Sequence, residues 1–144
     1  MTGHAFQVLS DDEDLRISLT AIRSVLTPNG RFIFETRNPL ARGWEAWVPE
    51  NAVEIVDATG AVVRMAHRVE KIDKDLVTFI ATFSSSSWDE PKRSRSTLKF
   101  LSALSLSLFL TDAGLAVAKQ FGDWDRQPLT ESSPEIITIA HREE

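Results

Sequence analysis

The spacing of apolar residues predicts a helix near the start of the chain. Over residues 11–26 the apolar positions recur every three or four residues and form one face of a helix, made by Leu15, Leu19, Ile22 and Leu26. Ser10 and Glu13 have the spacing of a capping box, and the acids between them suit the positive end of a helix dipole. The helix should end at the breakers in 27–30.

A short apolar run over 31–36 follows and predicts a strand that is buried on both faces. Residues 1–9 are interpreted as the end of a strand with its loop. Residues 40–52 contain two tryptophans and two chain breakers, so they are expected to form a loop or a short turn.

Over residues 53–101 apolar and polar residues tend to alternate, and this pattern predicts four antiparallel strands. They are expected over 53–57, 62–71, 76–84 and 92–101, and they are separated by turns that contain Gly60 and 73–75 and by a loop at 85–91. One face of the second strand carries Val63, Met65, His67 and Val69.

The segment 101–114 fits two periods. Its leucines alternate with other residues as in a strand, yet two of them also have helical spacing. Ser102 has the position of a helix N-cap and Gly114 that of a helix end, but residue propensity alone favours a strand over this segment. Strands are predicted over 115–121 and 135–141, with a loop between them.

Composition excludes several functional classes. The 144 residues carry 16 basic and 21 acidic side chains, a net charge of −5, which argues against nucleic acid as a partner. The length and the 42% hydrophobic share suit one globular domain. No apolar run has the roughly 18 residues that indicate a membrane span. The absence of cysteine and of a secretory pattern favours a cytoplasmic protein without disulfides.

The six glycines are widely separated, at Gly3, Gly30, Gly43, Gly60, Gly114 and Gly122. Neither a G-x-G nor a G-x-x-x-x-G-K motif can be written, so the chain has no standard glycine-rich loop for a nucleotide.

The order of the predicted elements resembles the C-terminal half of a class I S-adenosylmethionine-dependent methyltransferase. Four stretches carry the resemblance, and they span almost the whole chain: 2–7, 26–32, 111–115 and 133–137. They resemble, in turn, the loop after the family's fourth strand, the turn into the fifth, the end of the helix before the sixth and the start of the seventh. The resemblance decides between the two alternatives for 101–114 and predicts a helix over 103–113.

The resemblance implies an α/β fold, a partial Rossmann-like methyltransferase sheet with an antiparallel β insert. Strand 135–141 should lie between 31–36 and 115–121 and run antiparallel to both. The whole chain 1–144 would be a single partial domain with the insert at 53–101. The implied activity is methyl transfer from S-adenosylmethionine to a small molecule. The family's donor-binding loop is missing, so we expect this chain to be inactive alone and to bind the donor poorly if at all.

The same resemblance implies site positions near the start of the chain. Thr2 and Gly3 would face the donor, and His4 would orient the substrate or accept its proton. The alternative is a frayed chain end. Arg37 and Asn38 follow a strand at the usual ligand side of an open α/β sheet, and otherwise they simply begin a turn.

Aromatic residues supply further candidates. Trp47 and Trp124 are candidates for the wall of a substrate pocket, because an indole can line an apolar cavity or hold a cationic amine. The alternative is that they pack the core. His67 is a weaker pocket candidate, since a histidine on an apolar strand face usually only packs there. The three histidines have no metal-ligand spacing.

A second functional hypothesis is a non-catalytic module that self-associates or binds a small ligand. Donor binding would discriminate the two hypotheses. The resemblance also predicts a homodimer. In the family the 31–36 strand pairs with the fourth strand, of which only the last one or two residues would be present, so the 31–36 edge would be open and apolar surface would be uncovered.

Overall fold

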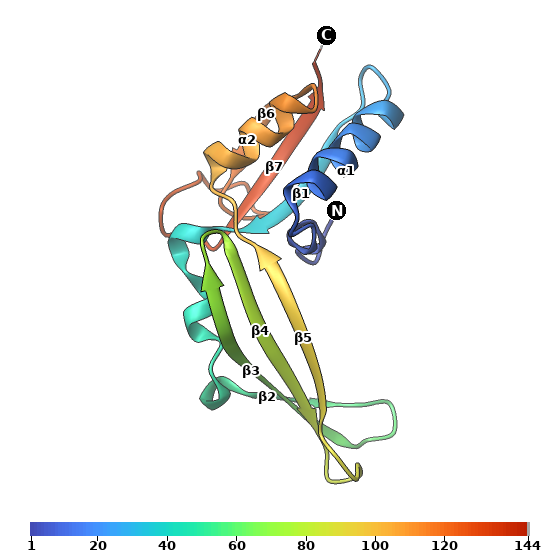
Figure 1. Cartoon of the computed structure of the whole chain (residues 1–144), viewed down its shortest axis with the longest axis vertical. Helices are drawn as coiled ribbons and strands as arrows, with labels where there is room; N and C mark the ends of the chain where they lie inside the picture. The colour runs from blue at the N-terminus through green and yellow to red at the C-terminus, as the bar shows by residue number, and fades with distance from the viewer. Residues whose placement is uncertain (144) are drawn as a thin grey trace. The chain divides into compact units, whose positions relative to one another are not determined.

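The computed structural model describes residues 1–143, and the chain divides into two compact units. Unit one comprises residues 1–42 and the described residues from 99 onward, and unit two comprises Gly43–Leu98. Figure 1 shows the elements of both. The sequence places the insert at 53–101, and this expected domain boundary stays a prediction.

Unit one contains a three-stranded sheet of order β1-β7-β6. Its strands are β1 (Phe32–Arg37), β6 (Leu115–Phe121) and β7 (Glu135–Arg142). β7 lies in the middle and runs antiparallel to both neighbours, with Phe34 opposite Thr138 and Val117 opposite Ala140. The strand order and directions expected from the resemblance are therefore present.

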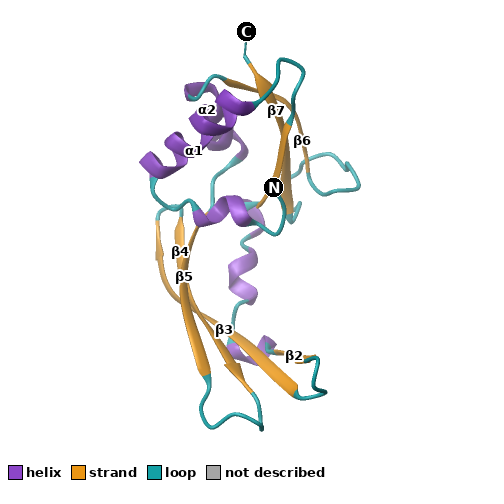
Figure 2. Ribbon diagram, turned by 90° about the vertical axis from the view of Figure 1, so that its right-hand side faces the viewer, coloured by secondary structure: helices purple, strands orange, loops and turns teal. Residues whose placement is uncertain are grey.

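Two helices, α1 (Asp12–Val25) and α2 (Ala103–Asp112), cover one face of this sheet, as Figure 2 shows for β6 and β7. Their buried leucines pack against apolar side chains from all three strands. The buried core consists of Phe6, Leu15, Leu19, Phe34, Leu101, Leu106, Leu110, Leu115, Ile136 and Ala140. Since side chains alternate along a strand, Glu35 and Glu135 belong to the opposite face.

Helix α1 begins one residue later than a cap at Ser10 requires. Asp11 is the N-cap: its Oδ1 accepts hydrogen bonds from the backbone nitrogens of Glu13 (2.8 Å) and Asp14 (3.1 Å). The predicted capping box is wrong because a carboxylate one residue closer makes the stronger, charge-assisted bonds to the free N–H groups.

The ambiguous segment 101–114 forms helix α2. The hydroxyl of Ser102 accepts a hydrogen bond from the backbone nitrogen of Ser105 (3.1 Å), as expected of an N-cap. Gly114 follows the helix with φ of 73°, a left-handed conformation that suits glycine. The helix buries Leu106 and Leu110 and leaves Leu104 and Leu108 exposed, whereas in a strand all four leucines would share one face.

The first nine residues correct another expectation. They hold a short 3₁₀ helix, η1 (Ala5–Val8), and no strand. The ring of Phe6 stacks on that of Phe34 in β1, with centroids 4.2 Å apart. Burial of this ring in the core stabilises the 3₁₀ conformation over the extended one that the sequence suggested.

Unit two is a four-stranded sheet of order β2-β3-β4-β5. Its strands are β2 (Val53–Val56), β3 (Val62–Asp73), β4 (Leu76–Ser84) and β5 (Lys92–Lys99), close to the predicted ranges. β3 runs antiparallel to both β2 and β4. The predicted loop at 40–52 holds the short 3₁₀ helices η2 (Pro39–Ala41), η3 (Gly43–Ala46) and η4 (Pro49–Asn51).

Along β3, the face with Val63, Met65, His67 and Val69 is half-buried, whereas Val62, Arg64 and Arg68 are exposed. The predicted alternation of this strand is therefore present. Within residues 1–143, no helix has the length and apolar character that a membrane crossing requires.

Candidate active site

Glu35 is the side chain around which the candidate site is built. It is 7% exposed, near the end of β1 and on the sheet face opposite the helices. Its Oε1 accepts the backbone N–H groups of Gly3 and His4, the latter at 3.2 Å. Its Oε2 accepts the indole N–H of Trp124. Three donors from two distant segments therefore converge on one carboxylate.

These contacts set the ionisation of Glu35. Burial raises the pKa of its carboxyl, but the hydrogen bonds from Trp124, His4 and Gly3 and the nearby His4 ring lower it, so that the net pKa lies below the ordinary value. The group is thus held as a carboxylate at neutral pH.

A second carboxylate holds the imidazole of His4. Its Nε2 lies 2.9 Å from both Oε1 and Oε2 of Glu135, the first residue of β7. Both side chains are about one-fifth exposed. His4 itself has φ of 57°, and Gly3 has φ of 68°, so two successive left-handed residues turn the chain sharply just before η1. This turn brings the ring to the end of the sheet.

Arg37 adds a positive charge near the carboxylates of Glu35 and Glu135. It is the last residue of β1 and lies directly opposite Glu135 in the ladder. Its backbone N–H and guanidinium both donate to Oε1 of Gln7 at 3.1 Å. Burial lowers the pKa of the guanidinium, and the charges of Glu135 and Glu35 oppose that change. Alternating charges therefore lie along the ends of β1 and β7.

Gln7 joins Arg37 to the segment that precedes α2. Besides binding Arg37, it donates from Nε2 to the carbonyl of Lys99 at 3.0 Å. The side chain of Gln7 is fully buried, and both its amide oxygen and its amide nitrogen are bonded. It therefore joins the end of β1 to the backbone of Lys99, within unit one.

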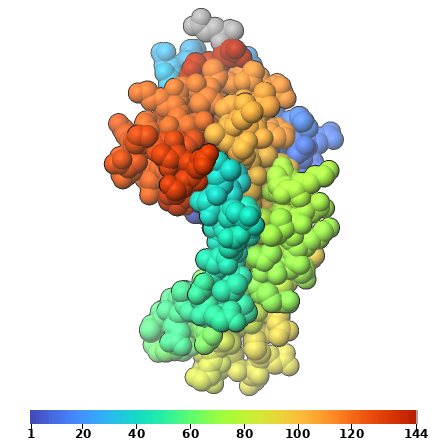
Figure 3. All heavy atoms as spheres, turned by 90° about the vertical axis from the view of Figure 1, so that its left-hand side faces the viewer, coloured from blue at the N-terminus to red at the C-terminus, as the bar shows by residue number. Residues whose placement is uncertain are grey.

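The structure brings several predicted residues together and separates others. Gly3, His4 and Trp124 meet at Glu35, and Arg37 lies beside Glu135. Thr2 is exposed next to them. The indole of Trp124 hydrogen-bonds to Glu35 although the residue is 48% exposed, in the surface loop between β6 and β7 (Figure 3, orange to red).

Asn38 is buried and bonded to the chain itself. Its amide nitrogen donates to the carbonyls of Thr130 (3.1 Å) and Ser133 (2.9 Å), and its Oδ1 accepts from the backbone of Leu40 (3.1 Å). These bonds hold the loop that carries Trp124. The role in a pocket that the sequence suggested for Asn38 stays a prediction.

Trp47 and His67 belong to unit two, where they lie against each other. The ring centroids of Trp47 and His67 are 6.2 Å apart, and each also contacts the ring of Phe79, at 4.7 and 5.7 Å. The three rings form a packed aromatic cluster on the half-buried face of β3 and β4. Whether the cluster lines a substrate pocket stays a prediction.

Sequence reasoning missed Glu35, Glu135 and Gln7. Glu35 carried a usable signal, because it is a charged residue between the apolar Phe34 and the buried Thr36 in a strand read as buried on both faces. A charge at such a position needs partners. Gln7 and Glu135 carried no local signal, since their partners are distant in the sequence.

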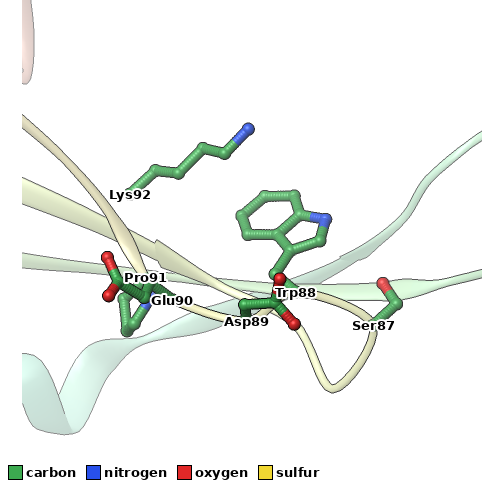
Figure 4. Close-up of a pocket in the computed structure, with 6 residues that line it drawn as sticks. All are labelled: Ser87, Trp88, Asp89, Glu90, Pro91 and Lys92. Carbon is green, nitrogen blue, oxygen red and sulfur yellow. The ribbon is translucent and has the colours of Figure 1, made fainter.

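A hollow in unit two is lined by residues of the β4–β5 loop and by the first residue of β5. Figure 4 shows the six consecutive residues that line it, Ser87 to Lys92. The ammonium of Lys92 lies 5.0 Å from the centre of the Trp88 ring. Because all six lining residues are consecutive in the chain, this cation–π pair is best explained as ordering of the loop against the start of β5.

No protein-family model and no curated protein matches the sequence. Solved structures do match the fold. An S-adenosylmethionine-dependent methyltransferase from Clostridium acetobutylicum has a TM-score of 0.76 and 13% identity, over 99% of this chain and 56% of its own. The CcbJ methyltransferase from Streptomyces caelestis has a TM-score of 0.75 and 16% identity, over 99% and 55%.

A third similar structure is an amino pentose methyltransferase of calicheamicin biosynthesis from Micromonospora echinaspora, solved with S-adenosylmethionine. Its TM-score is 0.64 with 16% identity, over 98% of this chain and 56% of its own. The chain therefore spans about half the length of the methyltransferases it matches. It has the mixed α/β fold of part of an S-adenosylmethionine-dependent methyltransferase.

Proposed function

We propose that this chain is the C-terminal part of an S-adenosylmethionine-dependent methyltransferase that acts on a small molecule, and that it supplies the acceptor side of the active site. The observation that carries the proposal is the convergence of His4, Glu35, Trp124 and Glu135 at one end of a methyltransferase-type sheet. The similar structures support methyl transfer as the activity of the complete enzyme.

His4 is proposed as the proton acceptor. When its Nε2–H donates to Glu135, the ring leaves Nδ1 unprotonated, and this nitrogen takes the proton of the acceptor as its new bond to the methyl carbon forms. The methyl donor then leaves as a neutral thioether. Because the sulfonium is already activated, positioning supplies most of the rate enhancement.

The remaining predicted residues are given binding roles. Thr2 and Gly3 face the donor, where glycine permits a close backbone approach. Arg37 and Trp124 contact the acceptor: the indole offers a flat apolar surface, and the guanidinium offers hydrogen-bond donors. Trp47, His67 and Asn38 remain pocket candidates in the proposal.

The chain alone should not transfer methyl groups, because its glycine spacing excludes the glycine-rich loop that the resemblance assigns to donor binding. The test is an assay of the purified chain with labelled S-adenosylmethionine and a panel of small amines and alcohols. We expect no product above the level of a His4→Gln control. Donor-dependent methylation that disappears in the control would contradict the claim of inactivity.

A second candidate function is a non-catalytic module that binds a small ligand. It is favoured by the 48% exposure of Trp124, whose indole N–H is nevertheless fixed by Glu35. If this indole contacts a ligand, tryptophan fluorescence should change with an aromatic or amine ligand and change less in Trp124→Phe. A ligand response without any donor response would favour this function.

A further inference from the structure

Glu35 links two segments that are far apart in the sequence. It lies 32 residues from Gly3 and 89 residues from Trp124. The two carboxylate oxygens are divided between them: Oε1 takes the backbone of Gly3 and His4, and Oε2 takes the indole of Trp124. The turn at Gly3 and His4 and the β6–β7 loop are thus hydrogen-bonded to the same carboxylate.

Only an ionised carboxylate fits this environment. All three partners are N–H donors, so both oxygens must accept. A neutral amide has a single oxygen and would direct its own N–H₂ at one of the donors. The carboxylate is also almost fully buried, which makes an unmatched donor or charge costly.

We propose that Glu35 is a positioning residue that couples His4 to Trp124. Loss of a hydrogen bond from either segment then changes the hydrogen bonds that the shared carboxylate makes with the other. Its importance for methyl transfer rests on the proposed function, whereas the coupling itself does not. Glu135 has a different task, because it holds the ring of His4 and not its backbone.

The charged groups around Glu35 support this coupling. His4 approaches from the N-terminal segment, Arg37 follows on β1, and Glu135 begins β7. From the β6–β7 loop comes the indole itself, which the exposed Asp123 and Asp125 flank. The donors lower the pKa of Glu35 despite burial, so removal of any one donor should raise it.

The test is ¹⁵N NMR of the full chain as a function of pH. The indole N–H of Trp124 and the amides of Gly3 and His4 should titrate together, with one midpoint below the ordinary 4.5 of a glutamate. Trp124→Phe removes one donor at an exposed residue, so the fold should survive. It should raise the midpoint seen at Gly3 and His4, because one of the donors that lower the pKa of Glu35 is lost.

Two control variants make the result specific. Trp88→Phe removes an indole in unit two and should leave the midpoint unchanged. Glu35→Gln should abolish the shared titration, whereas Glu135→Gln should leave it visible at Gly3 and Trp124. An unmoved midpoint in Trp124→Phe, or separate midpoints at the two segments, would overturn the coupling. Neither result depends on methyl transfer, so failure of the proposed function would be seen separately.

Discussion

At the scale of single residues, buried polar side chains organise unit one. Gln7 is fully buried, accepts two hydrogen bonds from Arg37 and donates one to the Lys99 carbonyl. The buried amide contributes to stability mainly because its removal would leave its partner groups without hydrogen bonds in a low-dielectric interior.

Replacing Gln7 by alanine should destabilise the chain by roughly 2–4 kcal/mol, the sum of a cavity and lost buried hydrogen bonds. Urea unfolding followed by circular dichroism measures the change. Gln127→Ala, at an exposed loop position, is the matched control and should cost little. Equal stability of the two variants would show that Gln7 does not organise this region.

Glu35 gives a pH dependence of known sign. Its folded-state pKa is lowered, so its contribution to stability is fully present above the unfolded pKa and is lost as pH falls through the folded pKa. Wild type should therefore be more stable than Glu35→Gln at pH 7, with the difference shrinking below about pH 4.5. Thermal melts across this range check it, and a difference that grows in acid would contradict it.

At the scale of elements, the start of α1 shows which of two neighbouring residues caps the helix, a choice that the sequence pattern alone did not settle correctly. Asp11 makes the cap bonds of α1, whereas Ser10 precedes it. Asp11→Ala should cost about 1 kcal/mol of unfolding free energy, and Ser10→Ala much less. Chemical denaturation of both variants measures the difference, and a larger loss in Ser10→Ala would restore the predicted capping box.

Local patterns predicted most elements but few site contacts. The spacing of Leu15 and Leu19 and the alternation around His67 were sufficient because each periodicity repeats within a few residues. The helix at 103–113 needed the resemblance, since its leucines fit both periods. The η1 turn and the Glu35 cluster were missed because their causes, such as stacking of Phe6 on Phe34, join distant parts of the chain.

At the scale of the whole molecule, we propose that the chain forms a homodimer. In the part of the chain that the structure describes, β1 pairs with β7 but with no strand on its other side, and Ile33 is 38% exposed. Phe34, by contrast, is covered by Phe6 and cannot contribute an exposed apolar edge. The nitrogen of Met1 donates to the carbonyl of Ile33 at 2.6 Å and occupies part of this edge.

Light scattering at micromolar concentration should give about twice the 16.1 kDa chain mass. Ile33→Lys places a charge on the exposed edge and should shift the equilibrium toward monomer, because charged edge residues oppose strand pairing. Leu104→Lys, at an exposed position of α2 and outside both sheets, is a control for the added charge. A monomeric wild type would contradict the dimer and would indicate that the N-terminal segment covers the edge sufficiently.

The most direct test of the account is a ¹⁵N NMR titration of the full chain with S-adenosylmethionine. Under the proposed roles of Thr2, Gly3 and His4 near the methyl donor, we expect weak binding, in the millimolar range, with shifts centred on these three residues, because the sequence has no glycine-rich loop. Tight saturable binding at micromolar donor would contradict the absence of a donor site. An unchanged spectrum at millimolar donor would contradict the donor-facing roles of Thr2 and Gly3 and would favour the non-catalytic module.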